Sequence, residues 1–229
     1  MQRFRAAREG AIARVAFDDG GMNLLSNDAL RELRDILRDV ETAAPALLVF
    51  ESARPRLFAA GADMAEMQRF TGLEAERFAR LGQELFEEIE RLPCITVAAI
   101  DGDCFGGALD LALAFDLRFA TPRSRFAHPG SKIGIVTGFG GTSRWRRVLT
   151  RAAANQLFLA NRTLGAEEAL ALGLVDRMAE SHDDELSRLE SLDPLTTTFV
   201  KELSAHAERL SGSETLLLAR RLGSVYGIS

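Results

Sequence analysis

The sequence predicts an α/β protein built around a largely parallel sheet. Short β-rich runs alternate with longer amphipathic runs through the first half of the chain, and strands separated by helices form parallel sheets. After Val175 the pattern becomes helical and strongly charged. We therefore expect a core domain over residues 1–178 and a short C-terminal helical segment over residues 179–229, which would serve assembly or cover a pocket.

The strands are expected where β-forming residues run without a break. Ile12–Phe17 is the first such run, and turn residues follow it. Ala46–Phe50 and Cys94–Ile100 are continuously apolar, which is typical of strands that are covered on both faces. A fourth strand is expected at Leu117–Ala120.

The helices are expected between these strands. Ser26 or Asn27 can cap a helix whose apolar residues recur every three to four positions. A long amphipathic helix over Thr71–Leu92 should end at Pro93, because proline cannot continue a helix. The remaining helices are expected at Gly106–Phe115, Arg151–Leu159 and Ala166–Leu172.

Composition and charge exclude several classes of function. The 229 residues carry 28 basic and 33 acidic side chains, so a net charge of −5 leaves no general field for nucleic acid or an anionic membrane. No apolar run reaches the ~20 residues of a membrane span. Cys94 and Cys104 are read as reduced thiols. We expect a cytoplasmic protein with no nucleic-acid or membrane partner.

Two glycine- and alanine-rich segments are the candidates for chemistry. Phe58–Asp63 follows the second strand and Gly102–Ala108 follows the third, and ligands of α/β proteins bind at the carboxyl ends of strands. Small side chains let a ligand approach the backbone closely, and glycines that open a helix leave free N–H groups. Two converging N–H groups would form an oxyanion hole. The glycine cluster Gly138–Gly141 fits no phosphate loop.

Four blocks carry a resemblance to a known family. They are FAAGADMAEM at Phe58–Met67, GDCFGGALDLALAFDLRFA at Gly102–Ala120, GFGGTSRW at Gly138–Trp145 and AEEALALGLVD at Ala166–Asp176. In order and spacing they resemble the enoyl-CoA hydratase/isomerase, or crotonase, family over roughly residues 10–178. The resemblance implies a spiral of ββα units, assembly as a homotrimer or a dimer of trimers, and an acyl-CoA substrate.

The resemblance also implies which residues bind coenzyme A. The backbone at Ala60, Gly61 and Asp63 would lie near the adenine, and Arg56 falls where the family often places a basic residue for the phosphates. Arg54 lies nearby and could share this task, and simple solvation is the alternative for both arginines. Coenzyme A arrives as part of the thioester substrate, so we expect no separate cofactor and no metal.

The catalytic positions depart from the family pattern. The resemblance implies that the amides of Ala62 and Gly107 polarise the thioester carbonyl. A hydratase of this family uses two glutamates, and this chain has Asp110 at the first position and Gly130 at the second. Asp110 is also interpretable as a carboxylate that only favours a helix start. His128 and Thr137 remain as further polar candidates.

The sequence thus favours an enzyme of the hydratase/isomerase type, a lyase or isomerase, that stabilises a thioester enolate. The alternatives are a non-catalytic acyl-CoA-binding or assembly protein of the same fold, a CoA-thioester decarboxylase or hydrolase, and the ring-forming dihydroxynaphthoyl-CoA synthase branch. Gly130 favours the non-catalytic alternative, whereas Asp110 and the two small-residue segments favour the enzyme. His182, which lies in a charged stretch, is interpreted as a surface group.

Overall fold

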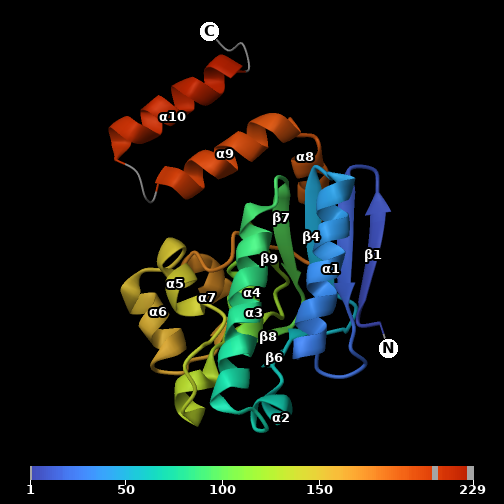
Figure 1. Cartoon of the computed structure of the whole chain (residues 1–229), viewed down its shortest axis with the longest axis vertical. Helices are drawn as coiled ribbons and strands as arrows, with labels where there is room; N and C mark the ends of the chain where they lie inside the picture. Colours follow the sequence, from blue (N-terminus) through green and yellow to red (C-terminus); the bar gives the residue numbers. More distant parts are fainter. Residues whose placement is uncertain (1, 208–210, 226–229) are drawn as a thin grey trace.

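A computed structural model describes residues 2–207 and 211–225 of the chain. Its main sheet has the strand order β1-β2-β4-β7-β9-β12 (Figure 1). β1 pairs antiparallel with β2, and the other neighbouring pairs are parallel. The strands are β1 (Phe4–Glu9), β2 (Ile12–Phe17), β4 (Leu47–Ser52), β7 (Ile95–Ile100), β9 (Leu117–Ala120) and β12 (Arg177–Met178).

Short strands form two further sheets. The second sheet has the order β11-β10-β8-β5, and the third pairs β3 with β6. Each of β4, β7 and β9 is followed directly by a strand of the second sheet, which gives the strand–strand–helix repeat that the resemblance implies. The short strands are β3 (Leu24–Leu25), β5 (Leu57–Ala59), β6 (Gly61–Ala62), β8 (Asp103–Phe105), β10 (Arg125–Ala127) and β11 (Leu164–Gly165).

The two longest helices, α1 and α3, begin at side-chain caps. Ser26 accepts from the Ala29 amide at the start of α1, and Thr71 forms a capping box with Glu74 at the start of α3. The helices are α1 (Asn27–Ala43), α2 (Met64–Met67), α3 (Gly72–Arg91), α4 (Gly107–Ala112), α5 (Gly141–Arg144), α6 (Arg151–Phe158), α7 (Ala166–Ala171), α8 (Asp183–Glu190), α9 (Pro194–Ala207) and α10 (Gly212–Val225). Short 3-10 turns lie at η1 (Pro129–Ile133) and η2 (Trp145–Arg147).

The main sheet has a hydrophobic core on each face. On one face it packs against α1 and α3, whose buried residues join a large aromatic cluster that includes Phe17 and Phe50. On the other face a smaller cluster brings Leu47 and Val49 of β4 against Leu186 and Leu189 of α8. Alternate residues of β4 therefore enter different cores, as expected for a strand that is covered on both sides.

The predicted strands at Ile12–Phe17 and Leu117–Ala120 are confirmed at the same bounds. β1 has no counterpart in the sequence prediction, because five of its six residues are exposed and only Phe4 is buried. The two small-residue segments contain β5, β6 and β8, which are too short to show a period of two. Their backbone pairing with neighbouring strands, and not a pattern in their own sequence, makes these segments strands.

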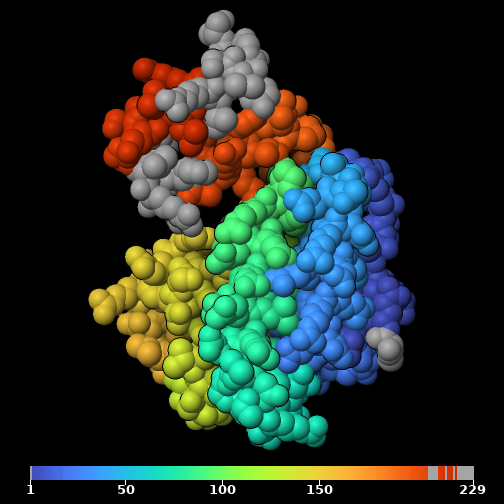
Figure 2. All heavy atoms as spheres, viewed as in Figure 1, coloured from blue at the N-terminus to red at the C-terminus, as the bar shows by residue number. Residues whose placement is uncertain are grey.

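The stretch after residue 178 forms three helices in the described part of the chain. α8 covers the sheet, whereas α9 and α10 lie at one end of the molecule beyond the ends of β4 and β7 (Figures 1 and 2). Lys201 anchors α9, because its Nζ donates to the Asp116 carboxylate at 2.7 Å and to the Cys94 carbonyl at 3.1 Å. None of the helices in residues 2–207 and 211–225 has the length and apolar character to cross a bilayer.

Candidate active site

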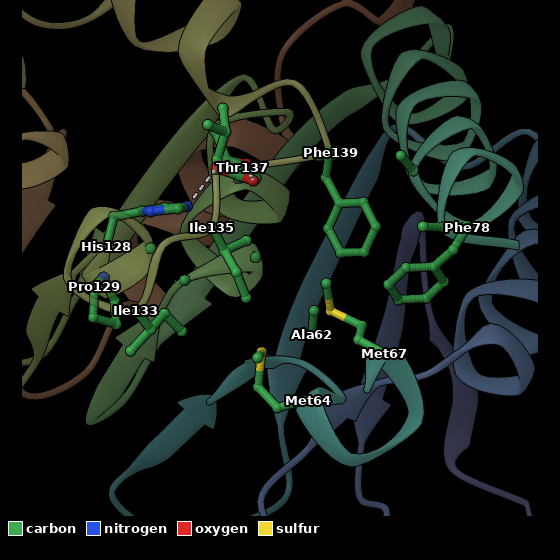
Figure 3. Close-up of a pocket in the computed structure, with 18 of the residues that line it drawn as sticks. Ala62, Met64, Met67, Phe78, His128, Pro129, Ile133, Ile135, Thr137 and Phe139 are labelled. Atoms are coloured by element: carbon green, nitrogen blue, oxygen red, sulfur yellow. Dashed lines mark hydrogen bonds and ion pairs between the residues drawn. The ribbon is translucent and has the colours of Figure 1, made fainter. Parts of the chain in front are cut away.

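A pocket of about 290 Å³ opens between α2 and α3 on one side and the segment from His128 to Phe139 on the other. In Figure 3, His128, Pro129 and Ile133 lie on one side of the pocket, and Met67 and Phe78 lie opposite. The lining is mostly apolar. Polar side chains enter it from Asp110, His128 and Thr137.

The two small-residue segments meet at one wall of this pocket. A Cβ atom on Gly61, which has φ 97°, would lie 2.6 Å from the Phe105 carbonyl oxygen and 2.8 Å from the Gly107 nitrogen. A Cβ on Gly107 would lie 3.3 Å from the Ala62 nitrogen. Only glycines permit this approach. It brings the backbone amides of Ala62 and Gly107 side by side, and both residues line the pocket.

The Gly107 amide is placed to serve a ligand. Gly107 is the first residue of α4, and an amide at this position has no acceptor within its own helix. The helix dipole adds partial positive charge at the same point. The wall can therefore stabilise negative charge on a bound oxygen.

Asp110 lies one turn into α4 and is completely buried. Its Oδ2 accepts a hydrogen bond from the Thr137 hydroxyl, and its Oδ1 lies 3.4 Å from His128 Nε2. A Cβ on Gly141 would lie 1.8 Å from Oδ1, so only glycine at 141 leaves space for the carboxylate. One stretch of chain after α4, residues 128–141, thus encloses the Asp110 carboxylate in the pocket wall.

His128 is also buried, and its ring lies against Phe158 with 4.8 Å between centroids. A Cβ on Gly130 would lie 2.6 Å from the Ile135 carbonyl oxygen and 3.3 Å from His128 Cε1. A carboxylate side chain at position 130 would therefore need the imidazole or the backbone to move. The structure places His128 and Thr137, which the sequence left as open candidates, on the two oxygens of Asp110.

Among the residues predicted to bind coenzyme A, Ala60 lines the pocket, and Gly61 and Asp63 flank it in sequence. The Asp63 carboxylate caps α2 by accepting from two amides, at 2.9 and 3.0 Å. Arg56 is exposed in the turn between β4 and β5 and does not line the pocket. Arg54 forms an ion pair with Asp18 at 3.8 Å.

Phe139 is a pocket residue that the sequence analysis missed. A Cβ on Gly82 of α3 would lie 2.2 Å from its ring, and a Cβ on Gly107 would lie 3.0 Å from it. The ring also packs edge-on against Phe78, with centroids 5.1 Å apart. No local sequence pattern marks Phe139 as a pocket residue, because its place in the pocket depends on contacts with Gly82 and Gly107 of other helices.

The Cys104 thiol is a further titratable group close to Asp110. Burial raises the pKa of the Cys104 thiol well above its usual value, and the nearby Asp110 raises it further. The thiol therefore stays neutral beside the carboxylate. Within the described residues, no three His, Cys, Asp or Glu side chains gather in a way that would hold a metal ion.

Comparison with known proteins identifies the family of the chain. The sequence model described as enoyl-CoA hydratase/isomerase matches residues 7–216. The chain belongs to the enoyl-CoA hydratase/isomerase family. It is 33% identical over 175 residues to a short-chain-enoyl-CoA hydratase of Clostridium acetobutylicum, covering 76% of this chain and 67% of that protein. It is 36% identical over 163 residues to a crotonyl-CoA hydratase of Syntrophomonas wolfei, covering 71% and 63%.

Solved structures show the same fold. An enoyl-CoA hydratase from Thermoplasma volcanium superimposes with a TM-score of 0.93 at 23% identity, covering 98% of this chain and 92% of that one. Pseudomonas aeruginosa DspI gives 0.92 at 24% identity, covering 100% and 97%. The predicted α/β fold of the enoyl-CoA hydratase/isomerase family is thereby confirmed. The chain spans about two thirds of the length of the two hydratases named above.

Proposed function

We propose that this chain binds an acyl-CoA thioester in the pocket and catalyses a hydratase- or isomerase-type reaction through an enolate-like intermediate. The observation that supports the proposal is the close approach of the Ala62 and Gly107 backbone in a pocket wall that also contains Asp110. The names of the two curated relatives support the same class of substrate.

The two amides would act on the thioester carbonyl. When the carbon next to the carbonyl loses a proton, or when a nucleophile adds to a conjugated double bond, negative charge develops on the carbonyl oxygen. Two preorganised N–H donors stabilise that charge more than they stabilise the neutral thioester, so they lower the barrier. The apolar lining strengthens this electrostatic effect, because little water competes.

Asp110 would supply the carboxylate on which proton transfer depends. It is the carboxylate in the wall of the pocket, and Thr137 and His128 flank it. The rest of the ligand would extend from Ala60–Asp63 toward solvent, and Arg56 would meet the phosphates. The lining by Met64, Met67 and Phe139 favours an apolar acyl group.

The test is a turnover screen of the purified protein against enoyl-, β-hydroxyacyl- and malonyl-type CoA thioesters, with Gly107→Pro beside the native chain. This substitution removes one N–H of the oxyanion hole and should lower turnover by about 10²–10³. Gly72→Pro is the matched control, because Gly72 is the first residue of α3 and its Cβ position has no neighbour within 4 Å. Proline is tolerated at this helix position.

Two results would contradict the proposal. Full activity in Gly107→Pro would remove the amide from the mechanism. Binding of acyl-CoA without turnover of any thioester would favour the non-catalytic alternative instead.

A further inference from the structure

We propose that His128 is the proton-transferring residue of this pocket and that Asp110 orients it. The inference rests on the proposed function and names the atom through which the proton moves. The imidazole of His128, two residues before Gly130, would take the place of the second carboxylate, which this chain lacks.

The contact between Asp110 and His128 supports a role for the imidazole. Asp110 Oδ1 and His128 Nε2 face each other at 3.4 Å, and both atoms are buried without a hydrogen-bond partner elsewhere among the described residues. Leaving two buried polar atoms unpaired is unfavourable, so each is the natural partner of the other. In Figure 3 the dashed line from the His128 ring marks this pair.

The chemistry of a carboxylate then fixes the state of the ring. An ionised carboxylate only accepts hydrogen bonds, so the proton on the contact belongs to His128 Nε2. Nδ1 is the nitrogen left to take up and release a second proton. The Thr137 hydroxyl holds the other oxygen of Asp110, which keeps the carboxylate from turning away from the imidazole.

Gly130 leaves space beside the ring of His128. A Cβ at this position would lie 3.4 Å from His128 Nδ1 and 3.3 Å from Cε1, so any side chain there would cover that edge of the ring. With glycine, the Nδ1 edge is uncovered on this side, while Phe158 supports the face of the ring. Both Gly130 and His128 line the pocket. Glycine at position 130 therefore lacks the second carboxylate and, for the same reason, leaves space for the imidazole of His128.

The proposed step conserves atoms and charge. The bond between the α-carbon of the thioester and its hydrogen breaks, and its electron pair forms the carbon–carbon double bond of the enolate. The π electrons of the carbonyl move to the oxygen that the Ala62 and Gly107 amides hold. The proton bonds to His128 Nδ1, and Asp110 offsets the charge of the imidazolium. The reverse step returns a proton to the α-carbon.

The experiment follows exchange of the α-hydrogens of butyryl-CoA in D₂O by mass spectrometry. The native chain should incorporate deuterium, and His128→Gln should do so about 10²-fold more slowly, with butyryl-CoA affinity within twofold by calorimetry. Glutamine keeps an N–H for Asp110 but has no titrating nitrogen. His182→Gln is the matched control, because His182 also lies against a phenylalanine, Phe119 at 5.3 Å, away from the pocket.

His128→Ala provides the second variant. It leaves the space of the ring empty, so imidazole added to the buffer should restore exchange. Exchange that stays lost in the presence of imidazole would overturn the proposal, as would His128→Gln exchange within twofold of the native rate. If the native chain binds butyryl-CoA but exchanges nothing, the proposed function itself fails together with this inference. Native exchange with an unaffected His128→Gln variant overturns the inference alone.

Discussion

Burial shifts the pKa of individual side chains in this molecule. It raises the pKa of the Cys94 thiol to about 11, with Asp116 adding to the effect and Lys201 opposing it. It lowers the pKa of His182, and Arg177 lowers it further. Because His182 is half-buried and its ring lies against Phe119, with 5.3 Å between centroids, the interpretation of this residue as a surface group is wrong.

Replacing Asp110 with asparagine should lower turnover of the best substrate by ~10²–10⁴, the usual contribution of one positioned acid or base, because His128 would lose the carboxylate that orients it. Asparagine is nearly isosteric, so acyl-CoA affinity and the thermal midpoint should change little. An amide can also present its NH₂ group to His128, which would favour the wrong tautomer of the ring. Steady-state kinetics with calorimetry on the same preparation check this. Native turnover in Asp110→Asn would reduce Asp110 to a helix-start carboxylate.

His182 should make stability depend on pH. Its pKa in the folded chain lies below the 6.5 of an unperturbed histidine, so between these two values the unfolded state binds more protons. The free energy of unfolding should therefore fall as pH is lowered through this window. Urea unfolding at pH 7.5 and 5.5 should show a smaller difference in His182→Gln than in the native chain. An equal difference in both proteins would contradict the assignment.

At the scale of elements, the sequence predicts a helix well where it contains a cap and a proline, and it predicts very short strands poorly. The bounds of α3 follow from Thr71 and Pro93, which the sequence shows directly. The third sheet does not follow, because β3 and β6 have two residues each and pair across a long stretch of chain. Ala62, Gly107 and Asp110 could be named as candidate site residues from the sequence, because they lie in the blocks that carry the family resemblance.

The other half of the site was less predictable. Phe139 and His128 reach the pocket only through tertiary contacts with Gly82 and Asp110, and no local pattern encodes such contacts. The sequence shows at Gly130 only the absence of the second glutamate, whereas the structure shows that glycine at this position also leaves space beside the imidazole of His128.

Phe139 should limit the length of the acyl group. Its ring fills the space between Gly82 of α3 and Gly107 of α4, so Phe139→Leu should open the pocket there. The ratio of kcat/KM for an eight-carbon over a four-carbon enoyl-CoA should rise by about tenfold. Phe86→Leu is the control, because Phe86 packs on Phe139 at 5.5 Å without lining the pocket. An unchanged ratio in Phe139→Leu, or the same rise in both variants, would argue against this role.

At the scale of the whole molecule, the C-terminal stretch has two different relations to the core. α8 buries Leu186 and Leu189 against the sheet, while Asp183 and Asp184 in its first turn are exposed. A strongly charged sequence therefore forms a packed helix. α9 and α10 stand at one end and expose Leu195, Val200, Leu216 and Leu217. The domain boundary at residue 178 stays a prediction, and residues 208–210 and 226–229 of the predicted C-terminal segment lie outside the described part.

Assembly is the prediction that belongs to this scale. The resemblance implies a homotrimer or a dimer of trimers, and the exposed apolar residues of α9 and α10 are suited to be buried in such an assembly. Light scattering at micromolar concentration should report a mass of three or six chains of 25.0 kDa. A monomer under these conditions would contradict the prediction and leave those residues without a partner in solution.

A crystal structure with butyryl-CoA bound tests the central claim most directly. The account predicts that the thioester carbonyl oxygen accepts hydrogen bonds from the Ala62 and Gly107 amides at about 2.7–3.2 Å, with the α-carbon on the side of His128 and Asp110. A thioester bound elsewhere, or one whose carbonyl points away from both amides, would contradict it.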